Sequence, residues 1–378
     1  MHPRWRVLPL LVLLAAGCEK TPSPPSPQEQ AEGYYLKGNT EYLQGKFTEA
    51  LASFETMKKL SPDDPRLPAA VGEVYLSLGR LDEAQKQFEQ ALLREPKRST
   101  NWSRLGFIHA QLGHADEAQK ALDKALGFNP RDFNALEQVA ELQLKRGETD
   151  AAVKSLLRAA EASPESSKSP LVLRAAEMLT HKERHAEARL MLEEWAGKGV
   201  KTAELYTALG DEQVRAGRLA QAATSYREAA ALSPKDPTLW ELVGEIQARL
   251  DKPAEAVAAY RESLKVKDRA VVHVALARLH LARNERPAAE AELGKALESV
   301  SGGDVRELME LADLLSTMGR KPDALRILTN LSAEPDHAKD EDLQLRTAAL
   351  AQELKDEATV RAACARVAKG GAAPRKCP

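Results

Sequence analysis

Apolar residues recur along most of this chain at spacings of three and four, which give an α-helix one buried face. From residue 31 onward the pattern itself repeats about every 34 residues. One alanine marks the same place in each repeat: Ala50, Ala84, Ala118, Ala152, Ala188, Ala222, Ala256, Ala289 and Ala324. The pattern predicts a series of similar helical pairs.

Two further positions keep the same period. A small residue precedes the alanine by twelve positions: Gly38, Gly72, Gly106, Ala140, Ala176, Gly210, Gly244, Ala277 and Ala312. A large apolar residue follows it by four: Phe54, Phe88, Leu122, Leu156, Leu192, Tyr226, Tyr260, Leu293 and Leu328. The small residues would let the two helices of a pair approach closely, and the large residue would fill the space beside them. Glycines such as Gly45 and Gly79 lie between the expected helices, where a left-handed residue can end the first one.

The third repeat carries the pattern most fully, with Trp102-x2-Leu105-Gly106, then Ala118-x3-Leu122, then Pro130. This resembles the tetratricopeptide repeat, a helix-turn-helix unit of 34 residues. The resemblance covers about residues 31–338. It implies an all-α fold, an α-solenoid of about nine repeats in which stacking supplies the core that a single pair lacks.

The expected organisation follows from these repeats. The predicted parts are a lipoprotein signal peptide (1–17), a Pro/Ser-rich tether (18–30), repeats one to four (31–166), a degenerate fifth repeat (167–202), repeats six to nine (203–338), a capping helical pair (339–369) and a flexible tail (370–378). The fifth repeat has Glu183 in place of the glycine between its helices, and Trp195 where small residues usually lie. With the segment ESSKSP at 165–170, it is the expected bend or boundary.

The first thirty residues carry an export signal. Arg4 and Arg6 precede a ten-residue apolar stretch, Val7–Ala16, which is too short to span a bilayer as a helix. Leu14-Ala15-Ala16-Gly17-Cys18 resembles the lipoprotein box of bacteria, although Ala15 replaces the usual leucine. The resemblance implies cleavage before Cys18 and attachment of diacylglycerol and a fatty acyl chain there. The alternatives are an ordinary cleaved signal and an uncleaved anchor.

The same segment predicts where the protein resides. A lipid on Cys18 would anchor the chain in a bacterial cell envelope, facing the periplasm, with residues 19–30 as an extended spacer. In the lipoproteins of enteric bacteria, aspartate after the cysteine favours retention in the inner membrane. Glu19 stands there instead, so the outer membrane is favoured over the inner membrane.

Composition and charge narrow the possible functions. The chain has 54 Lys+Arg against 56 Asp+Glu, and this balance argues against a nucleic-acid-binding surface. Aromatic residues make up 4%, so the core must consist mainly of alanine and leucine, which suits closely packed helices. Three cysteines are too few for a disulfide-rich scaffold or a four-cysteine zinc site. Cys364 and Cys377 could pair in an oxidising compartment or remain free thiols.

A search for catalytic chemistry yields little. His181 and His185 are four residues apart, but the glutamate between them is one place late for H-E-x-x-H. They fall at the expected turn of the fifth repeat, so we interpret them as a solvated turn. The sequence predicts no enzyme, no cofactor, no metal and no small-molecule substrate.

In the tetratricopeptide-repeat family, the first helices of the repeats line a concave groove that commonly binds peptides or partner helices. The family's groove positions predict these peptide-binding residues here: Tyr35, Asn39, Tyr42, Glu73, Phe107, Gln111, Glu141, Lys145, Asp211, Arg215, Glu245 and Arg249. Tyr35, Tyr42 and Phe107 could recognise a partner or fill gaps between helices. The carboxylate clamp of one subgroup is largely absent, because only Asn39 and Arg104 match it.

The leading hypothesis is a non-catalytic, membrane-tethered scaffold that binds an envelope protein or peptide. Related lipoproteins act in the assembly of pili, secretion channels or outer-membrane complexes. Two alternatives stay open: a repeat-containing envelope hydrolase, and a structural spacer with no specific ligand.

Overall fold

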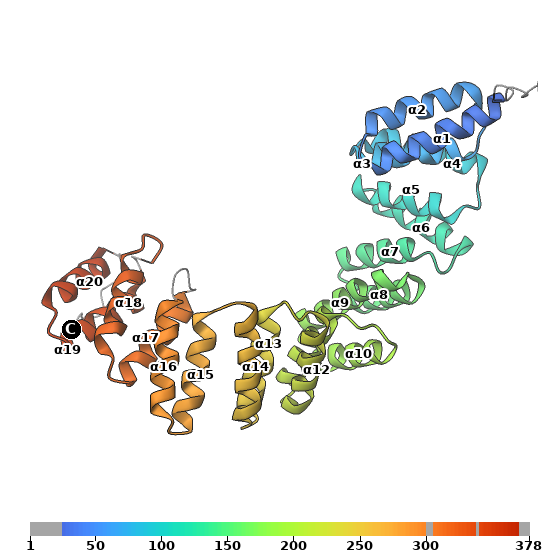
Figure 1. The fold of residues 1–378 in the computed structure, drawn as a ribbon. Coiled ribbons are helices and arrows are strands. Elements are labelled where there is room, and N and C mark those ends of the chain that lie inside the picture. Colours follow the sequence, from blue (N-terminus) through green and yellow to red (C-terminus); the bar gives the residue numbers. More distant parts are fainter. Residues whose placement is uncertain (1–24, 300–304, 338–339, 370–378) are drawn as a thin grey trace, which may run out of the picture. The chain divides into compact units, whose positions relative to one another are not determined.

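The computed structural model describes residues 25–299, 305–337 and 340–369, and this part of the chain is all-α, with twenty helices and no strand (Figure 1). The first eight helices are α1 (Pro27–Leu43), α2 (Phe47–Leu60), α3 (Arg66–Ser77), α4 (Leu81–Arg94), α5 (Ser99–Gln111), α6 (Ala115–Phe128), α7 (Phe133–Lys145) and α8 (Thr149–Ala162). The next six are α9 (Glu165–His181), α10 (His185–Gly197), α11 (Ala203–Arg215), α12 (Leu219–Leu232), α13 (Pro237–Arg249) and α14 (Pro253–Val266). The last six are α15 (Ala270–Ala282), α16 (Arg286–Glu298), α17 (Val305–Thr317), α18 (Lys321–Ala333), α19 (Glu341–Glu353) and α20 (Glu357–Lys369).

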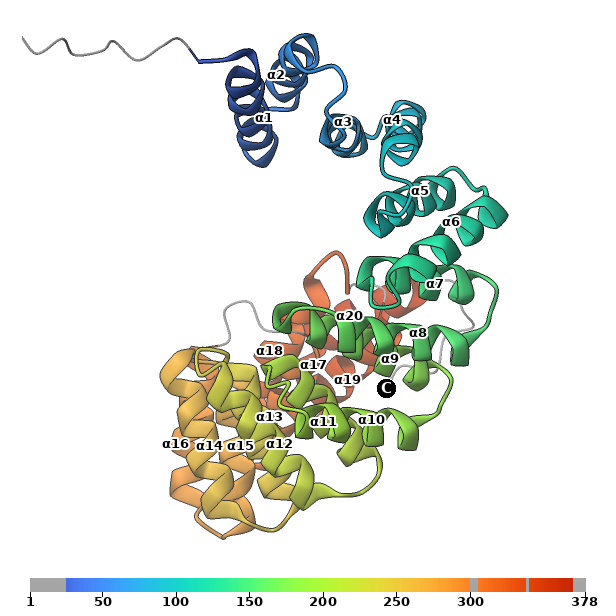
Figure 2. The same cartoon turned by 90° about the vertical axis from the view of Figure 1, so that its right-hand side faces the viewer.

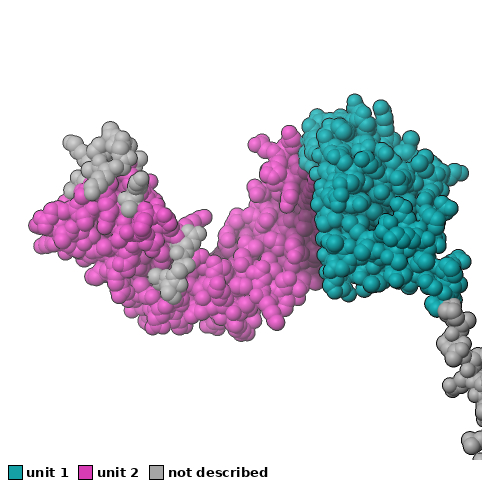
Figure 3. Space-filling view, turned by 90° about the horizontal axis from the view of Figure 1, so that it is seen from above, with its two compact units in different colours: residues 1–162 teal, residues 163–378 magenta. Residues whose placement is uncertain are grey.

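The chain divides into two compact units, residues 1–162 and residues 163–378 (Figure 3). The division lies beside the segment 165–170, where the sequence predicts a boundary. Within the first unit, the pairs from α1–α2 to α7–α8 follow one another in chain order (Figure 2). The second unit continues the series with six more pairs, from α9–α10 to α19–α20. Each odd-numbered helix is the first of its pair, and we call the side formed by these helices within one unit its first-helix side.

The repeating alanine and its two partner positions form the core between the helices of each pair. All nine alanines are completely buried. In the second repeat, a Cβ placed on Gly72 of α3 would lie 2.8 Å from the ring of Phe88 on α4. The same close approach joins Gly38 to Phe54 and Gly244 to Tyr260. The large residue therefore packs directly on the small residue of the first helix, and this contact is why the three positions keep one period.

Each of the ten pairs turns at one left-handed residue between its helices. At Gly79, φ is +70°; its N–H donates to the Leu76 carbonyl, and the N–H of Arg80 donates to the Tyr75 carbonyl. This is the hydrogen-bond pattern that closes a helix at its carboxyl end. The fifth repeat forms the same turn although it lacks the glycine, because Glu183 adopts φ 59°. Asp251, Asn284 and Lys355 are the other non-glycine residues in this conformation among the described residues.

Two expected boundaries are wrong by a few residues. The tether was expected to extend to residue 30, but α1 begins at Pro27. Ser26 and Glu29 form a capping box, in which each backbone N–H donates to the other side chain, and Pro27 suits the first helical position.

The segment 165–170 was expected to be an approach to the fifth repeat, but it is the first part of α9. Pro170 lies inside this helix. Because proline has no N–H, the helix lacks the backbone hydrogen bond from residue 170 to the carbonyl of residue 166. Trp195, which departs from the repeat pattern, is nevertheless 2% exposed and belongs to the core of its pair.

The final pair, α19–α20, lies within one residue of the helices that the sequence predicts at 341–369. The signal peptide (1–17), Cys18, the tail (370–378) and Cys377 lie outside the described residues, whereas Cys364 lies in α20. The pairing of Cys364 with Cys377 therefore stays a prediction. Among the described helices, none combines the length and the apolar character that a membrane span requires.

Candidate partner-binding surface

The first-helix side of the first unit contains a hollow of about 220 Å³. It is lined from α1, α3 and α5, chiefly by Tyr35, Asn39, Tyr42, Arg66, Glu73, Asn101 and Arg104. Four of the residues predicted to bind peptide, Tyr35, Asn39, Tyr42 and Glu73, are thus brought together. We call this the α1–α3–α5 hollow.

The charged side chains around this hollow are paired with one another. Arg66 contacts Glu32 at 2.7 Å and Asp64 at 2.8 Å, and its guanidinium lies 4.3 Å from the centre of the Tyr35 ring. The hydrogen bond from Arg66 lowers the pKa of Asp64 below its usual value. Arg104 Nε donates to Glu73 at 2.6 Å. Because these cations already have carboxylate partners, the hollow is not a strongly positive site for a carboxylate ligand.

The aromatic residues of the hollow are half-buried. Tyr35 and Tyr42 pack against the core cluster that contains Phe54, and the Tyr42 hydroxyl accepts a hydrogen bond from Ser77 at 3.2 Å. Both tyrosines also line the hollow. Their packing agrees with the gap-filling interpretation, and their place in the lining of the hollow leaves recognition of a partner as a prediction.

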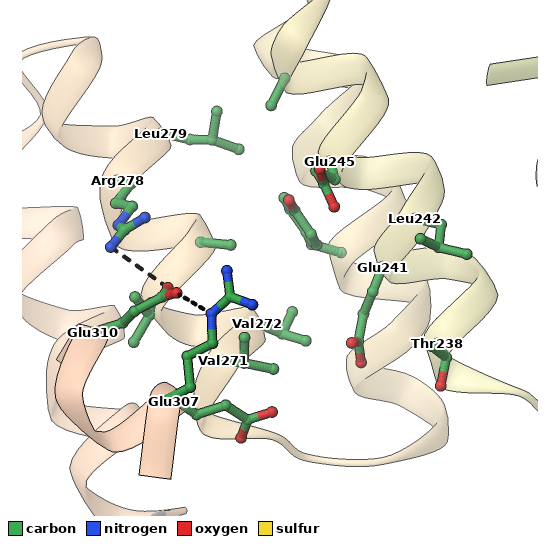
Figure 4. A pocket seen from close by; sticks show the side chains of 15 residues that line it. Thr238, Glu241, Leu242, Glu245, Val271, Val272, Arg278, Leu279, Glu307 and Glu310 are labelled. Atoms are coloured by element: carbon green, nitrogen blue, oxygen red, sulfur yellow. Dashed lines mark ion pairs between the residues drawn. The ribbon is translucent and has the colours of Figure 1, made fainter. Parts of the chain in front are cut away.

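A larger groove of about 700 Å³ lies on the first-helix side of the second unit. It is lined from α13, α15 and α17 (Figure 4), with Tyr260 of α14, and we call it the α13–α15–α17 groove. Of the predicted residues it contains Glu245. Its apolar lining includes Leu242, Val271, Ala275 and Leu279.

Carboxylates dominate the charge of this groove. Glu241, Glu245, Glu307 and Glu310 line it, together with two cations, Arg278 and Arg306. Arg269 fixes two of the carboxylates, with nitrogen–oxygen distances of 2.9 Å to Glu241 and 3.0 Å to Glu307. Burial raises the pKa of Glu241 despite the attraction of Arg269, so this carboxylate is held at some electrostatic cost.

Asp211 and Arg215 lie together in a third hollow, of about 240 Å³, formed by α9, α10 and α11. Asp211 accepts a hydrogen bond of 2.6 Å from the Tyr226 hydroxyl. The buried Glu212 accepts from Thr180 at 3.0 Å and lies 3.0 Å from His185 Nδ1. The interpretation of His185 as simply solvated is therefore wrong, because the histidine begins α10 and pairs with a buried carboxylate of α11.

The remaining predicted residues border none of these three hollows. Phe107 packs against the core cluster of Ala84, Phe88 and Ile108, which favours the gap-filling interpretation for this residue. The other four lie on first helices: Gln111 on α5, Glu141 and Lys145 on α7, and Arg249 on α13. Three of these are the last residues of their helices and therefore lie next to the turns: Gln111, Lys145 and Arg249. Arg249 is 3.9 Å from Glu245 on the same helix.

Sequence reasoning missed most of the α13–α15–α17 groove. Val271 and Arg278 are the second and ninth residues of the eighth repeat, and Arg306 is the second of the ninth. These are groove positions by the family rule that supplied the other candidates. The predicted groove residues include none from the eighth or ninth repeat, although both form helical pairs, α15–α16 and α17–α18.

No group of three or more histidine, cysteine, aspartate or glutamate side chains suited to a metal ion occurs in the described part of the chain. Several histidines instead pair with carboxylates: His273 lies 2.6 Å from Glu292 and 2.9 Å from Asp268, and His280 lies 2.7 Å from Glu285.

Comparison with known families agrees with this architecture. Tetratricopeptide-repeat models match residues 41–112, residues 104–167 and 207–270, and residues 270–295. These segments together cover more than half of the 378 residues. The chain is a tetratricopeptide-repeat protein. Repeats of this family generally form scaffolds for protein interactions.

Comparison with individual proteins adds less. No curated protein matches the chain. A chain in the crystal structure of the APC/C hetero-tetramer Cut9-Hcn1 is similar at 17% identity, over 75% of this tetratricopeptide-repeat chain and 55% of that chain, with a TM-score of 0.35. The matched region thus spans about half the length of that chain, and a TM-score of this size does not establish a common arrangement of the repeats.

Proposed function

We propose that this tetratricopeptide-repeat protein is a non-catalytic scaffold of the bacterial cell envelope. A lipid on Cys18 tethers it to a membrane, the outer membrane in preference to the inner one, and its first-helix side binds an envelope protein or peptide. The scaffold then serves the assembly of a larger envelope complex, such as a pilus, a secretion channel or an outer-membrane complex.

The observation that carries the binding role is the coincidence of predicted groove residues with hollows. Residues selected by repeat position alone, among them Tyr42, Asp211 and Glu245, border three separate hollows on first helices. The tethering role is supported by the sequence around Cys18, where a basic start and a short apolar stretch end at a cysteine. Several acyl chains on that cysteine would hold firmly, at about 0.8 kcal/mol for each buried CH₂ group.

The tether is tested by metabolic labelling with an alkyne-bearing fatty acid and by membrane fractionation. Wild-type protein should take up the label and sediment with membranes, whereas Cys18→Ser should do neither. Cys364→Ser serves as the matched cysteine control and should behave as wild type. Equal labelling of wild type and Cys18→Ser would remove the tether from the proposal.

The binding role is tested in cells by a photo-crosslinking amino acid placed in turn at Tyr42, Phe107 and Glu245. Control positions are the exposed second-helix residues Lys120 and Glu255. One dominant envelope protein captured from first-helix positions and not from the controls would support the scaffold. Adducts that do not differ between the two sets would favour a structural spacer.

The enzyme alternative requires a catalytic group. His181 and His185 form the one histidine pair that the sequence singles out, and in the structure His185 is occupied by Glu212. An envelope hydrolase activity that is lost on His181→Ala together with His185→Ala, while the fold persists, would overturn the non-catalytic assignment.

A further inference from the structure

The α13–α15–α17 groove has an uneven distribution of charge across its width. In Figure 4, Glu241 and Glu245 lie on one side, on α13, and Arg278 and Glu310 lie on the other. Both cations of the lining are on the far side, where Arg278 and Arg306 approach the same Glu310 at 3.6 and 3.5 Å. The α13 side therefore contributes carboxylates to the groove and no cation.

Glu245 is the carboxylate of this side that a ligand can reach most readily. Its side chain is 60% exposed, against 17% for Glu241. Its partner in the protein is Arg249, one helical turn away at 3.9 Å and itself 45% exposed. Exposed pairs of this kind on a helix contribute little to stability. A ligand cation that is partly desolvated in the groove can therefore compete for Glu245.

Comparison with the preceding repeat shows a polar group left without a partner. Tyr226 and Asp211 occupy the repeat positions of Tyr260 and Glu245, and there the tyrosine donates to the aspartate at 2.6 Å. Among the described residues the Tyr260 hydroxyl has no hydrogen-bond partner, although it lines the groove. Burial and the nearby Glu245 and Glu241 raise the pKa of Tyr260 to about 12, so the hydroxyl keeps its proton at neutral pH.

Between these polar groups the lining is apolar. Leu242 lies on the α13 side, and Val271, Ala275 and Leu279 line the groove from α15 at spacings of four along one helical face. A volume of about 700 Å³ is enough for several side chains of a bound segment. A row of apolar side chains beside a carboxylate edge suits an amphipathic segment with basic residues.

We propose that this groove binds a partner segment in which apolar side chains flank a lysine or arginine. The apolar side chains lie over Leu242, Ala275 and Leu279, and the basic group lies against Glu245 on the α13 side. This rests on the proposed function, since it names the chemistry of the segment that the scaffold binds. An acidic segment is disfavoured, because it would face the exposed Glu245 and gain only cations that Glu310 already engages.

The experiment is a selection of random peptides displayed on phage against the purified chain without its signal peptide. The selected peptides are then measured by fluorescence polarisation on wild type and three variants. Glu245→Lys reverses the charge in the groove. Glu255→Lys makes the same change at an exposed position of α14 outside the groove. Arg278→Glu removes a cation from the far side.

The expected peptides are enriched in lysine or arginine between apolar residues. They should bind Glu245→Lys at least about tenfold more weakly than wild type, because like charges then oppose each other across the groove. Their affinity for Glu255→Lys should equal their affinity for wild type, and their affinity for Arg278→Glu should be higher than for wild type. Raising the salt concentration should weaken binding to wild type and reduce the differences among the variants. Circular dichroism and thermal melting of each variant check that the fold persists.

Three results would overturn the proposal, and they differ in what they leave standing. Selected peptides that bind Glu245→Lys more weakly than wild type but carry no basic residue would show that the groove binds segments of another chemistry. Basic peptides that bind Glu245→Lys and Glu255→Lys equally would place their site elsewhere. A selection that enriches no peptide sensitive to Glu245→Lys, together with a specific cellular adduct from Tyr42 alone, would retain the scaffold and remove this groove as its site.

Discussion

Two glycines of α1 should respond in opposite directions to the same substitution. A Cβ placed on Gly38 would lie 2.6 Å from Cε1 and 2.9 Å from Cδ1 of Phe54, and the Phe54 side chain is 1% exposed. A Cβ placed on Gly33 would meet nothing within 4 Å. Gly33 and Gly38 are both interior residues of one helix, so alanine gains about the same helix propensity at each, about 1 kcal/mol.

The difference between the two variants isolates the steric cost. Overpacking a well-packed core costs about 1–3 kcal/mol. The ring of Phe54 cannot move away easily, since it is buried and its centre lies 6.2 Å from that of Tyr35. We therefore expect Gly33→Ala to stabilise the first pair by up to about 1 kcal/mol. Gly38→Ala should destabilise it by up to about 2 kcal/mol after the propensity gain is subtracted.

The assay must report on one pair, because a repeat array does not unfold as a single two-state transition. Hydrogen exchange of the amides in α1 and α2, followed by mass spectrometry, gives the local free energy of opening. Protection should rise in Gly33→Ala and fall in Gly38→Ala, while the amides of α19 and α20 stay unchanged in both. Equal effects of the two substitutions on α1–α2 would refute the assignment of Gly38 as the point of closest helix approach.

Three other predictions concern the turns, the pH dependence and the tyrosines. Glu183→Gly should stabilise the fifth repeat by about 0.5–1 kcal/mol, because Glu183 holds φ 59° and its side chain is exposed; a lower melting temperature would contradict this. Burial raises the pKa of Glu292, but hydrogen bonds from Lys295 and His273 outweigh it and leave this pKa below its usual value. Glu292 therefore contributes stability above the unfolded pKa of about 4.3, which is lost as the pH falls through the folded pKa. Urea unfolding should show a larger loss in acid for wild type than for Glu292→Gln, and parallel pH profiles would argue against the contribution. Tyr226→Phe should cost about 1 kcal/mol through the lost bond to Asp211, whereas Tyr260→Phe should cost little, and thermal melting of both compares them directly.

The fold was largely predictable because each repeat uses the same contact. Alanine at Ala50 or Ala222 must be small for the helices to meet, and the residue four positions later must be large to cover the small residue of the first helix. Such a contact leaves a periodic trace that a single sequence records many times. The start of α1 at Pro27 was harder to predict, because it depends on a local capping box that does not recur with the repeat.

The turn of the fifth repeat keeps its conformation although its residue type differs. Glycine is the usual left-handed residue at this position, and Glu183 takes its place there. A left-handed residue other than glycine costs only about 1–3 kcal/mol, and the packing of α9 and α10 around Met178, Leu179 and Leu192 can supply that. The position, and not the residue type, is what the fold requires.

The candidate surface was predictable only in part, because groove positions are defined by geometry and their chemistry is not periodic. Repeat position led to Tyr35, Tyr42 and Glu245, which do border hollows, and equally to Phe107, which packs into the core. Volume depends on how far adjacent first helices separate and on which side chains project between them. The separation of the helices and the side chains between them depend on pairs of repeats, so the position of a residue within one repeat does not predict the volume of a hollow.

The two tyrosine positions illustrate how a repeating framework can acquire a specific site. Tyr226 and Tyr260 pack on Gly210 and Gly244 in the same manner, so both serve the fold. Their hydroxyls differ, because Tyr226 donates to Asp211 whereas the longer Glu245 is mainly exposed and forms no bond with Tyr260. The first arrangement satisfies its polar groups internally, and the second leaves a donor and a carboxylate beside an apolar groove. The framework positions thus maintain the stack, while the ninth position of the repeat differs: Asp211 accepts a hydrogen bond from its tyrosine, and the longer Glu245 does not.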